Sequence, residues 1–235
     1  MLVSFVNVSK NFYLDDNTII TPVQDTTLSV ARGEFILISG RSGSGKTTLL
    51  NLAAGLVRPT RGKVLIDDSD LHKMTDRQLT SFRCQKIGFV FQFPSLIPTL
   101  NALENVIVPT MFRSREVKHD ARERANSLLE MLGLSERIEA YPKQLSSGEQ
   151  KRVVIARALM NHPELILADE PTSDLDEQTE REIMALFRTI HASGKTIIMV
   201  THNLELVSYA TRAFKMENST LKEVAGKHGQ EKTDF

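Results

Sequence analysis

Residues 40–47 read Gly40-Arg41-Ser42-Gly43-Ser44-Gly45-Lys46-Thr47, which matches the pattern G-x-x-x-x-G-K-[ST]. The glycines of such a segment let the backbone turn tightly and bring its N–H groups against an anion. The lysine can reach the outer phosphates of a nucleotide, and the threonine hydroxyl can hold Mg²⁺. The segment therefore predicts a loop that cradles a chain of phosphate groups.

The segments on both sides of this loop are those expected around a phosphate-binding loop. Residues 34–39 form a short apolar run that predicts a buried strand, and residues 48–54 predict a helix, whose N-terminus favours anions. A strand, a phosphate loop and a helix in this order are typical of P-loop NTPases, so we expect the chain to bind a nucleoside triphosphate. The candidate nucleotide-binding residues here are Gly40, Arg41, Ser42, Gly43, Ser44, Gly45, Lys46, Thr47 and Thr48.

Composition excludes several other classes of protein. The chain has 235 residues, with 29 Lys and Arg against 29 Asp and Glu, and this balance argues against nucleic acid as the main partner. A single cysteine, Cys84, excludes a disulfide framework and a cysteine-based zinc site. Because no apolar run approaches the ~20 residues that span a bilayer and the N-terminus lacks a signal-peptide pattern, we expect a cytosolic protein, or one held at a membrane only by a partner.

Hydrophobic patterning predicts an α/β fold. Helical spacing dominates residues 93–160, which predicts a helical subdomain inserted into a mostly parallel sheet with an N-terminal antiparallel β layer. We expect one domain over residues 1–224 and a frayed polar tail over 225–235. Asp15-Asp16-Asn17 is a turn signal, and Gly133 and Gly194 are expected to end helices. The predicted strands are 3–8, 26–30, 63–67, 87–91, 165–168 and 196–200, and the predicted helices are 116–132, 149–160 and 177–192.

Two carboxylates end one of the apolar strands. Asp169 and Glu170 follow residues 165–168 directly, and Pro171 ends the strand at once. A carboxylate at such a strand tip can bind Mg²⁺ directly or through water, which is the role we expect for Asp169. Glu170 is then placed to orient or deprotonate an attacking water, so it is a candidate catalytic residue.

The segment Leu145-Ser146-Ser147-Gly148-Glu149-Gln150 resembles the Leu-Ser-Gly-Gly-Gln signature of the ATP-binding cassette (ABC) family. By itself it predicts a serine and glycine loop at a helix N-terminus. The resemblance implies more, because in that family the loop clamps the γ-phosphate held by the other subunit of a dimer; Ser146 and Gly148 match. Ser147 and Glu149 depart from the pattern. If the backbone at Ser147 needs a positive φ, serine costs about 1 kcal/mol, and Glu149 brings a carboxylate toward the phosphate end.

Further positions match the same family. Gln92 resembles its Q-loop glutamine, a ligand of Mg²⁺ or water, and His202 resembles the switch histidine that contacts the γ-phosphate. Ser173-Asp174-Leu175-Asp176 resembles the D-loop. Phe12 lies where the family has an aromatic ring that stacks on adenine, with Tyr13 as an alternative. The remaining histidines are expected to be solvated surface residues: His72, His119, His162, His191 and His228.

The motif order from about residue 2 to residue 224 is complete for an ABC protein, which implies a P-loop NTPase fold of the RecA-like type. Residues 91–106 are similar to the MacB/LolD-type branch, whose ATPases pair with permeases that export substrates or release lipoproteins. Leu96, Ile97 and Leu100 can be core, or can line a groove for a permease helix.

The resemblance implies an ATPase with ATP and Mg²⁺ as its cofactors. It also implies a homodimer in the ATP-bound state, peripheral at the cytoplasmic face of the inner membrane through a permease, without direct membrane insertion. The exported or released substrate, whether a lipoprotein, a drug or a peptide, is not named by the chain. Two alternatives stay open: a soluble ABC ATPase of the iron–sulfur assembly type, and a low-turnover nucleotide-binding regulatory module, which Ser147 suggests.

Overall fold

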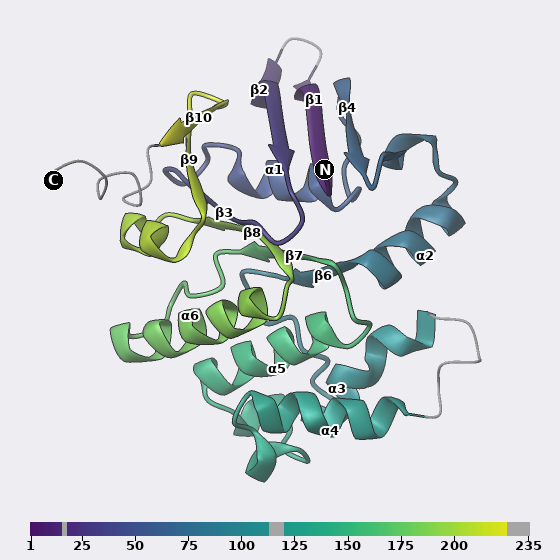
Figure 1. Ribbon diagram of the computed structural model, residues 1–235, viewed down its shortest axis with the longest axis vertical. Coiled ribbons are helices and arrows are strands. Elements are labelled where there is room, and N and C mark those ends of the chain that lie inside the picture. Colours follow the sequence, from purple (N-terminus) through teal and green to yellow (C-terminus); the bar gives the residue numbers. More distant parts are fainter. Residues whose placement is uncertain (16–17, 113–119, 225–235) are drawn as a thin grey trace, which may run out of the picture. The chain divides into compact units, whose positions relative to one another are not determined.

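The computed structural model describes residues 1–15, 18–112 and 120–224 (Figure 1). The chain divides into two compact units. One unit contains residues 1–76 together with the chain from residue 196 onward, and the other contains residues 77–195. The predicted helical subdomain, residues 93–160, lies inside this second unit, and the predicted tail, 225–235, lies outside the described residues.

The first unit contains an antiparallel sheet with the strand order β2-β1-β4-β5. Buried and exposed side chains alternate over residues 26–30 of β2, and cross-strand partners such as Phe5 and Leu28 are both buried on one face. The predicted strands 3–8 and 26–30 are correct but short, because β1 continues to Asp15 and β2 begins at Thr18. Asp16 and Asn17 of the predicted turn lie outside the described residues. The strands are β1 (Val3–Asp15), β2 (Thr18–Val30), β4 (Arg61–Ile66) and β5 (Ser69–Asp70).

A second group of strands in this unit carries the phosphate loop. Strand β3 (Phe35–Ser39) lies between β8 (Thr196–Thr201) and β9 (Arg212–Glu217), both parallel to it, and every residue of β3 and β8 is buried. Helix α1 (Lys46–Ala53) follows the loop. Strands β9 and β10 (Thr220–Val224) form an antiparallel hairpin that the sequence did not predict, because charged residues interrupt both segments.

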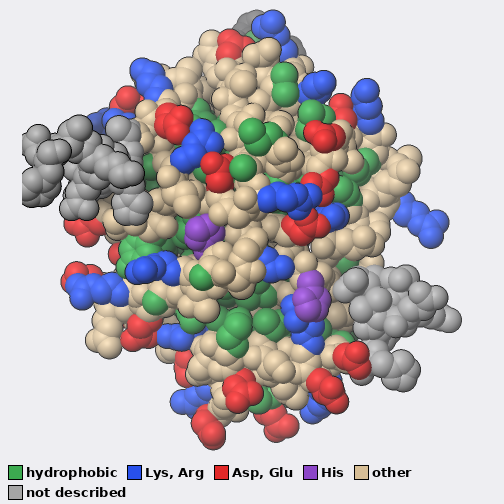
Figure 2. Space-filling view, viewed as in Figure 1, with side chains coloured by type: hydrophobic (Ala, Val, Ile, Leu, Met, Phe, Trp, Pro, Cys, Tyr) green, Lys and Arg blue, Asp and Glu red, His purple; other side chains and the backbone are tan. Residues whose placement is uncertain are grey.

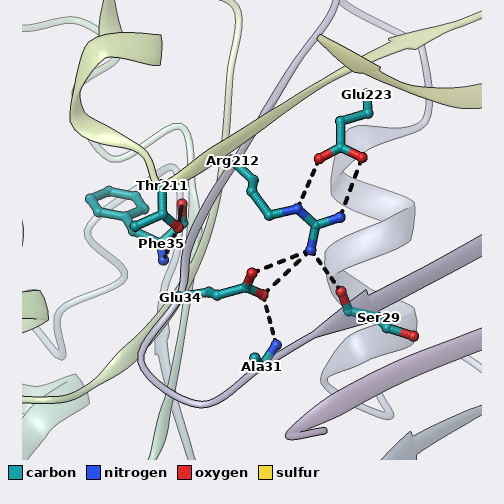
Figure 3. Close-up of polar contacts among 7 residues, drawn as sticks. All are labelled: Ser29, Ala31, Glu34, Phe35, Thr211, Arg212 and Glu223. Atoms are coloured by element: carbon teal, nitrogen blue, oxygen red, sulfur yellow. Dashed lines mark hydrogen bonds and ion pairs between the residues drawn. The ribbon is translucent and has the colours of Figure 1, made fainter. Parts of the chain in front are cut away.

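Arg212 fastens this hairpin to the rest of the unit (Figure 3). Its guanidinium donates to Glu223 at 2.8 Å, to the carbonyl of Ser29 at 3.0 Å and to Glu34 at 3.3 Å. Glu34 also accepts the N–H of Ala31 at 2.7 Å. The hydrogen bond to Glu223 and the charges of both carboxylates raise the pKa of Arg212. One cation thus joins β9 and β10 to the turn between β2 and β3.

The second unit contains a pair of parallel strands and most of the helices. Strand β6 pairs with β7 from Ile87 opposite Leu165 to Val90 opposite Ala168. Helix α5 contacts β6 and three other helices, α3, α4 and α6. Its apolar residues are buried on almost every side, which is typical of a helix at the centre of a packed unit. The elements are α2 (Asp76–Lys86), β6 (Ile87–Val90), α3 (Ala102–Ile107), α4 (Ala121–Met131), α5 (Ser147–Leu159), β7 (Leu165–Asp169) and α6 (Glu177–Ala192).

Local signals account for several helix boundaries. Asn101, Ser146 and Asp176 each accept a backbone N–H as the N-cap of α3, α5 and α6. Gly133 and Gly194 follow helices with φ of 74° and 87°, the left-handed conformation predicted for them. Of the predicted helix 116–132, residues 116–119 lie outside the described residues. Helix α2 was not predicted, since it buries only Leu79.

The surface carries charges of both signs. Blue and red side chains alternate over the face shown in Figure 2, as the equal numbers of basic and acidic residues lead one to expect. Throughout residues 1–15, 18–112 and 120–224, no helix combines the length and the apolar character needed to cross a bilayer.

Candidate functional site

The phosphate loop wraps around the side chain of Lys46. This residue is only 4% exposed, and its Nζ donates to the carbonyls of Gly40 at 2.8 Å and Arg41 at 3.0 Å. Gly43 and Gly45 adopt φ of 76° and 103°, which residues with a side chain rarely adopt. The loop therefore places one ammonium group, and the N-terminus of α1 behind it, where the sequence predicts phosphates.

Neighbouring strands fix the shape of this loop. A Cβ on Gly45 would lie 1.9 Å from the carbonyl oxygen of Pro22 in β2, and one on Gly40 would lie 2.6 Å from that of Met216 in β9. The hydroxyl of Ser44 is buried without a hydrogen-bond partner among the residues that the structure describes. An unpaired buried hydroxyl is costly, so this group fits a loop that accepts an oxygen-rich anion.

His202 lies at the same edge of the sheet as the phosphate loop. Strands β3 and β8 are parallel neighbours, and Ser39 pairs with Thr201. Gly40 and His202 follow these two residues directly, and the imidazole of His202 is exposed. Ligands of open α/β sheets bind beyond the carboxyl ends of the strands, which is where both predicted residues lie.

The two candidate adenine-stacking residues face opposite sides of the β1–β2 hairpin. Phe12 pairs with Ile20 and Tyr13 with Ile19, and neighbouring residues of a strand point to opposite faces. Phe12 is 38% exposed and Tyr13 67%. Lys10 places its ammonium 4.8 Å from the centre of the Phe12 ring, within cation–π distance. Only one of the two rings can therefore stack on a given base.

In the second unit, the predicted metal and catalytic residues leave one edge of the β6–β7 pair. Asp169 is the last residue of β7 and is buried, and Gln92 comes two residues after β6. Glu170 has a φ of 43°, and its carbonyl accepts both the N–H and the hydroxyl of Ser173, at 3.1 and 3.0 Å. A left-handed residue that is not glycine is strained and is often found at functional sites.

Sequence reasoning missed a buried cation beside these residues. Lys151 of α5 is 4% exposed, and its Nζ donates to the backbone carbonyl of Gln92. Burial lowers the pKa of Lys151, while the nearby charges of Asp174 and Asp169 oppose that shift. One signal was available: Lys151 lies three and four residues before Val154 and Ile155, on a helix face that the pattern predicts to be buried.

The signature segment forms the N-terminus of α5. Ser146 accepts the N–H of Glu149 at 3.2 Å, and the Glu149 carboxylate accepts the N–H of Ser146 at 2.7 Å, so the two form a capping box. The carboxylate also accepts from Arg137 at 3.0 Å and is thereby held in the helix cap. Ser147 is the first residue of the helix and does not have a positive φ. Serine at this position therefore does not incur the cost of a left-handed backbone.

The expectation that His72 is a solvated surface residue is wrong. Both of its ring nitrogens are buried, and neither has a hydrogen-bond partner among the described residues. His162 is exposed and His191 is partly buried, while His119 and His228 lie outside the described residues.

The second unit also contains an apolar groove of about 470 Å³. Ile97 lines this groove, whereas Leu96 and Leu100 are partly buried outside it. Phe91 and Phe112 add exposed aromatic surface, and Arg157 is a cation among the lining residues. The groove-lining residues used below are Phe89, Phe91, Ile97, Phe112 and Arg157.

Comparisons with known proteins agree with these features. The "ABC transporter" family profile matches residues 23–173. An ABC transporter ATP-binding protein of Thermotoga maritima is 47% identical over 200 residues, 85% of either chain. The lipoprotein-releasing system ATP-binding protein LolD of Aquifex aeolicus is 46% identical over 82% of this chain and 85% of its own length. The macrolide export ATP-binding/permease protein MacB of Rhodopirellula baltica is 42% identical over 94% of this chain but only 33% of its own length.

A solved structure is similar over almost the whole chain. It is the dimeric post-hydrolysis state of the ATP-binding cassette MJ0796 bound to ADP and Pi. It has a TM-score of 0.87 and 39% sequence identity, and the match covers 95% of this chain and 99% of the other.

Proposed function

The chain belongs to the ABC transporter family, and from this premise we propose that it is the ATP-hydrolysing subunit of a MacB/LolD-type transporter that exports or releases a substrate through a partner permease. The observation that carries the proposal is the buried Lys46 ammonium held by the carbonyls of Gly40 and Arg41 inside a loop of left-handed glycines. Such a loop recognises phosphates. Membership of the family indicates that the nucleotide is ATP and that the reaction is its hydrolysis.

The residues present suit Mg²⁺ and ATP. Thr47, Gln92 and Asp169 offer oxygen atoms, the donors that Mg²⁺ prefers, and the unpaired Ser44 hydroxyl suits a phosphate oxygen. When bound there, Mg²⁺ would supply positive charge to offset the negative charge of the phosphates. Glu170 orients or deprotonates the attacking water, and His202 contacts the γ-phosphate.

We assign the remaining predicted residues to recognition. Phe12 stacks on adenine, and the N-terminus of α5 with Ser146 and Gly148 faces the γ-phosphate held by a second copy of the chain. Ser146 Oγ accepts the N–H of Glu149 to cap α5, and a side-chain hydrogen bond also joins Ser146 to the Glu149 carboxylate. A split site of this kind requires a homodimer in the ATP-bound state.

The catalytic assignment is tested with Glu170→Gln. The amide cannot take a proton, so turnover measured by phosphate release should fall while ATP binding persists, and light scattering should show an ATP-dependent dimer. Glu136→Gln, an exposed change on the same unit, is the control and should behave as the parent chain. Unchanged turnover in Glu170→Gln would exclude the catalytic role proposed for this residue.

The groove of the second unit is our candidate contact with the permease, which would hold the protein at the cytoplasmic face of the membrane. Its apolar lining includes Phe112, 65% exposed, which is unusual unless a partner covers it. Affinity purification of the tagged Glu170→Gln chain with ATP, from gently solubilised membranes, should recover a multi-helix permease. Phe112→Asp should lose that permease and keep ATP turnover, whereas Leu56→Asp, also at an exposed apolar site, should keep both.

Recovery of soluble partners alone would instead favour an assembly ATPase of the iron–sulfur type. The regulatory-module alternative rested on Ser147, whose helical backbone carries no strain. Phosphate release above background by the purified chain would exclude that alternative.

A further inference from the structure

Side chains of one helix hold the segment that follows β6. Residues 92–95 have no regular structure, and α5 anchors them through backbone carbonyls. Lys151 donates to the carbonyl of Gln92, and Arg157 donates to those of Pro94 at 3.1 Å and Ser95 at 2.9 Å. Because only carbonyls are used, the anchoring fixes the path of the backbone.

The two anchors differ in what surrounds them. Arg157 lies at the groove, whereas Lys151 is buried near the signature end of α5, beside the acidic residues Asp169 and Asp174. A buried ammonium is costly unless it is paired and hydrogen-bonded, so packing alone would favour an apolar residue here. The ammonium of Lys151 instead donates a hydrogen bond to the Gln92 carbonyl and interacts electrostatically with the two carboxylates.

We propose that Lys151 is a positioning residue, which holds Gln92 in register with the signature end of α5 and with Asp169. The inference rests on the proposed function for the roles of Gln92 and Asp169, but Lys151 itself need not touch nucleotide. Through the same segment it links the groove, lined by Phe91 and Ile97, to the end of the unit that carries the predicted catalytic residue Glu170.

The test compares Lys151→Met, which keeps the length of the side chain and removes its charge, with Lys151→Arg, which keeps the charge. Lys143→Met, at an exposed lysine eight residues earlier, is the matched control. Binding of a fluorescent ATP analogue, steady-state kcat and KM, and hydrogen exchange of peptides covering residues 91–95 are measured on the full chain. If Lys151→Met does not fold, Lys151→Gln takes its place.

We expect Lys151→Met to lower kcat by about 10- to 100-fold, the range for lost outer-shell partners of a site, with analogue affinity within about threefold of the parent. Exchange at residues 91–95 should accelerate, Lys151→Arg should restore most of kcat, and Lys143→Met should change nothing. Parent-like kcat and exchange in Lys151→Met would overturn the proposal, as would equal losses in Lys151→Met and Lys151→Arg.

Failure of the proposed function looks different. If the parent chain itself shows no ATP turnover, the ATPase assignment fails, while the exchange comparison still decides whether Lys151 holds the segment after β6.

Discussion

Gly148 of the signature segment and Thr179 of α6 lie so close that a Cβ on residue 148 would be 2.7 Å from Cγ2 of Thr179. Real Cβ atoms do not approach other atoms so closely, so a side chain at position 148 would force Thr179 to shift. The packing of α5 against α6 thus favours glycine in this signature, independently of any contact with a phosphate.

Gly148→Ala should therefore destabilise the protein. Overpacking of a core costs about 1–3 kcal/mol, which exceeds the gain of about 1 kcal/mol that alanine brings to a helix. Urea unfolding measures the difference. Thr179→Ser removes Cγ2 but keeps the hydroxyl that donates to Asp176 at 2.6 Å, so in that background Gly148→Ala should be neutral or stabilising. Equal costs in both backgrounds would exclude the Thr179 contact as the cause.

Gly45→Ala should abolish nucleotide binding and strongly destabilise the fold. Its Cβ would meet the carbonyl of Pro22 at 1.9 Å, and neither backbone can move without distorting the phosphate loop or β2. Gly33→Ala is the matched control, because Gly33 has a φ of 75° but a methyl group there would meet no other described atom within 4 Å. The free energy of unfolding of Gly33→Ala should fall by only about 1 kcal/mol, the cost of alanine in a left-handed conformation, and the variant should bind an ATP analogue normally. Similar losses in both variants would contradict the steric argument.

Glu149→Gln should make the free energy of unfolding less dependent on pH under acidic conditions. The Ser146 backbone N–H, followed by smaller contributions that include Arg137, lowers the pKa of Glu149 below its ordinary 4.5 in the folded protein. Its stabilising contribution is therefore present above that value and is lost as the pH falls through the lower folded pKa. Chemical unfolding between about pH 5 and pH 3 should show a shallower slope in the variant. An unchanged slope relative to Glu136→Gln would argue against the capping carboxylate.

His72→Leu should stabilise the protein, and more so in mild acid. Burial lowers the pKa of His72 from 6.5, and Arg58 adds to this while Asp70 opposes it. Below pH 6.5 the unfolded chain therefore binds a proton at His72 more readily than the folded chain does. The free energy of unfolding is highest above pH 6.5 and declines as the pH falls below that value. Removing two unpaired nitrogens should gain about 1 kcal/mol at neutral pH. His162→Asn, at an exposed site, should leave the pH dependence of the free energy of unfolding unchanged. If His72→Leu also leaves that dependence unchanged, His72 is not its source.

Several elements could be predicted from local sequence, and the failures have a common cause. The strand–loop–helix around Lys46 and the boundaries of α6 follow from short-range patterns and capping residues. Helix α2 was missed because it is mostly polar and buries only Leu79. Strands β9 and β10 were missed because charged residues interrupt them, and β9 also pairs with β3, which is far away in the sequence. Propensity cannot reveal a strand whose hydrogen bonds are made to a neighbour some 175 residues away.

The sequence by itself determined the family of this protein and predicted the residues of its site. The phosphate loop at Lys46, the carboxylates Asp169 and Glu170, and the signature at Ser146 are local patterns whose residue types carry their own physical reason. Tertiary structure alone decided that Lys151 is buried against the carbonyl of Gln92, that a side chain at position 148 would meet Thr179, and that both ring nitrogens of His72 are buried without partners among the described residues. These depend on contacts between residues far apart in the chain, and no local pattern encodes how closely such residues pack.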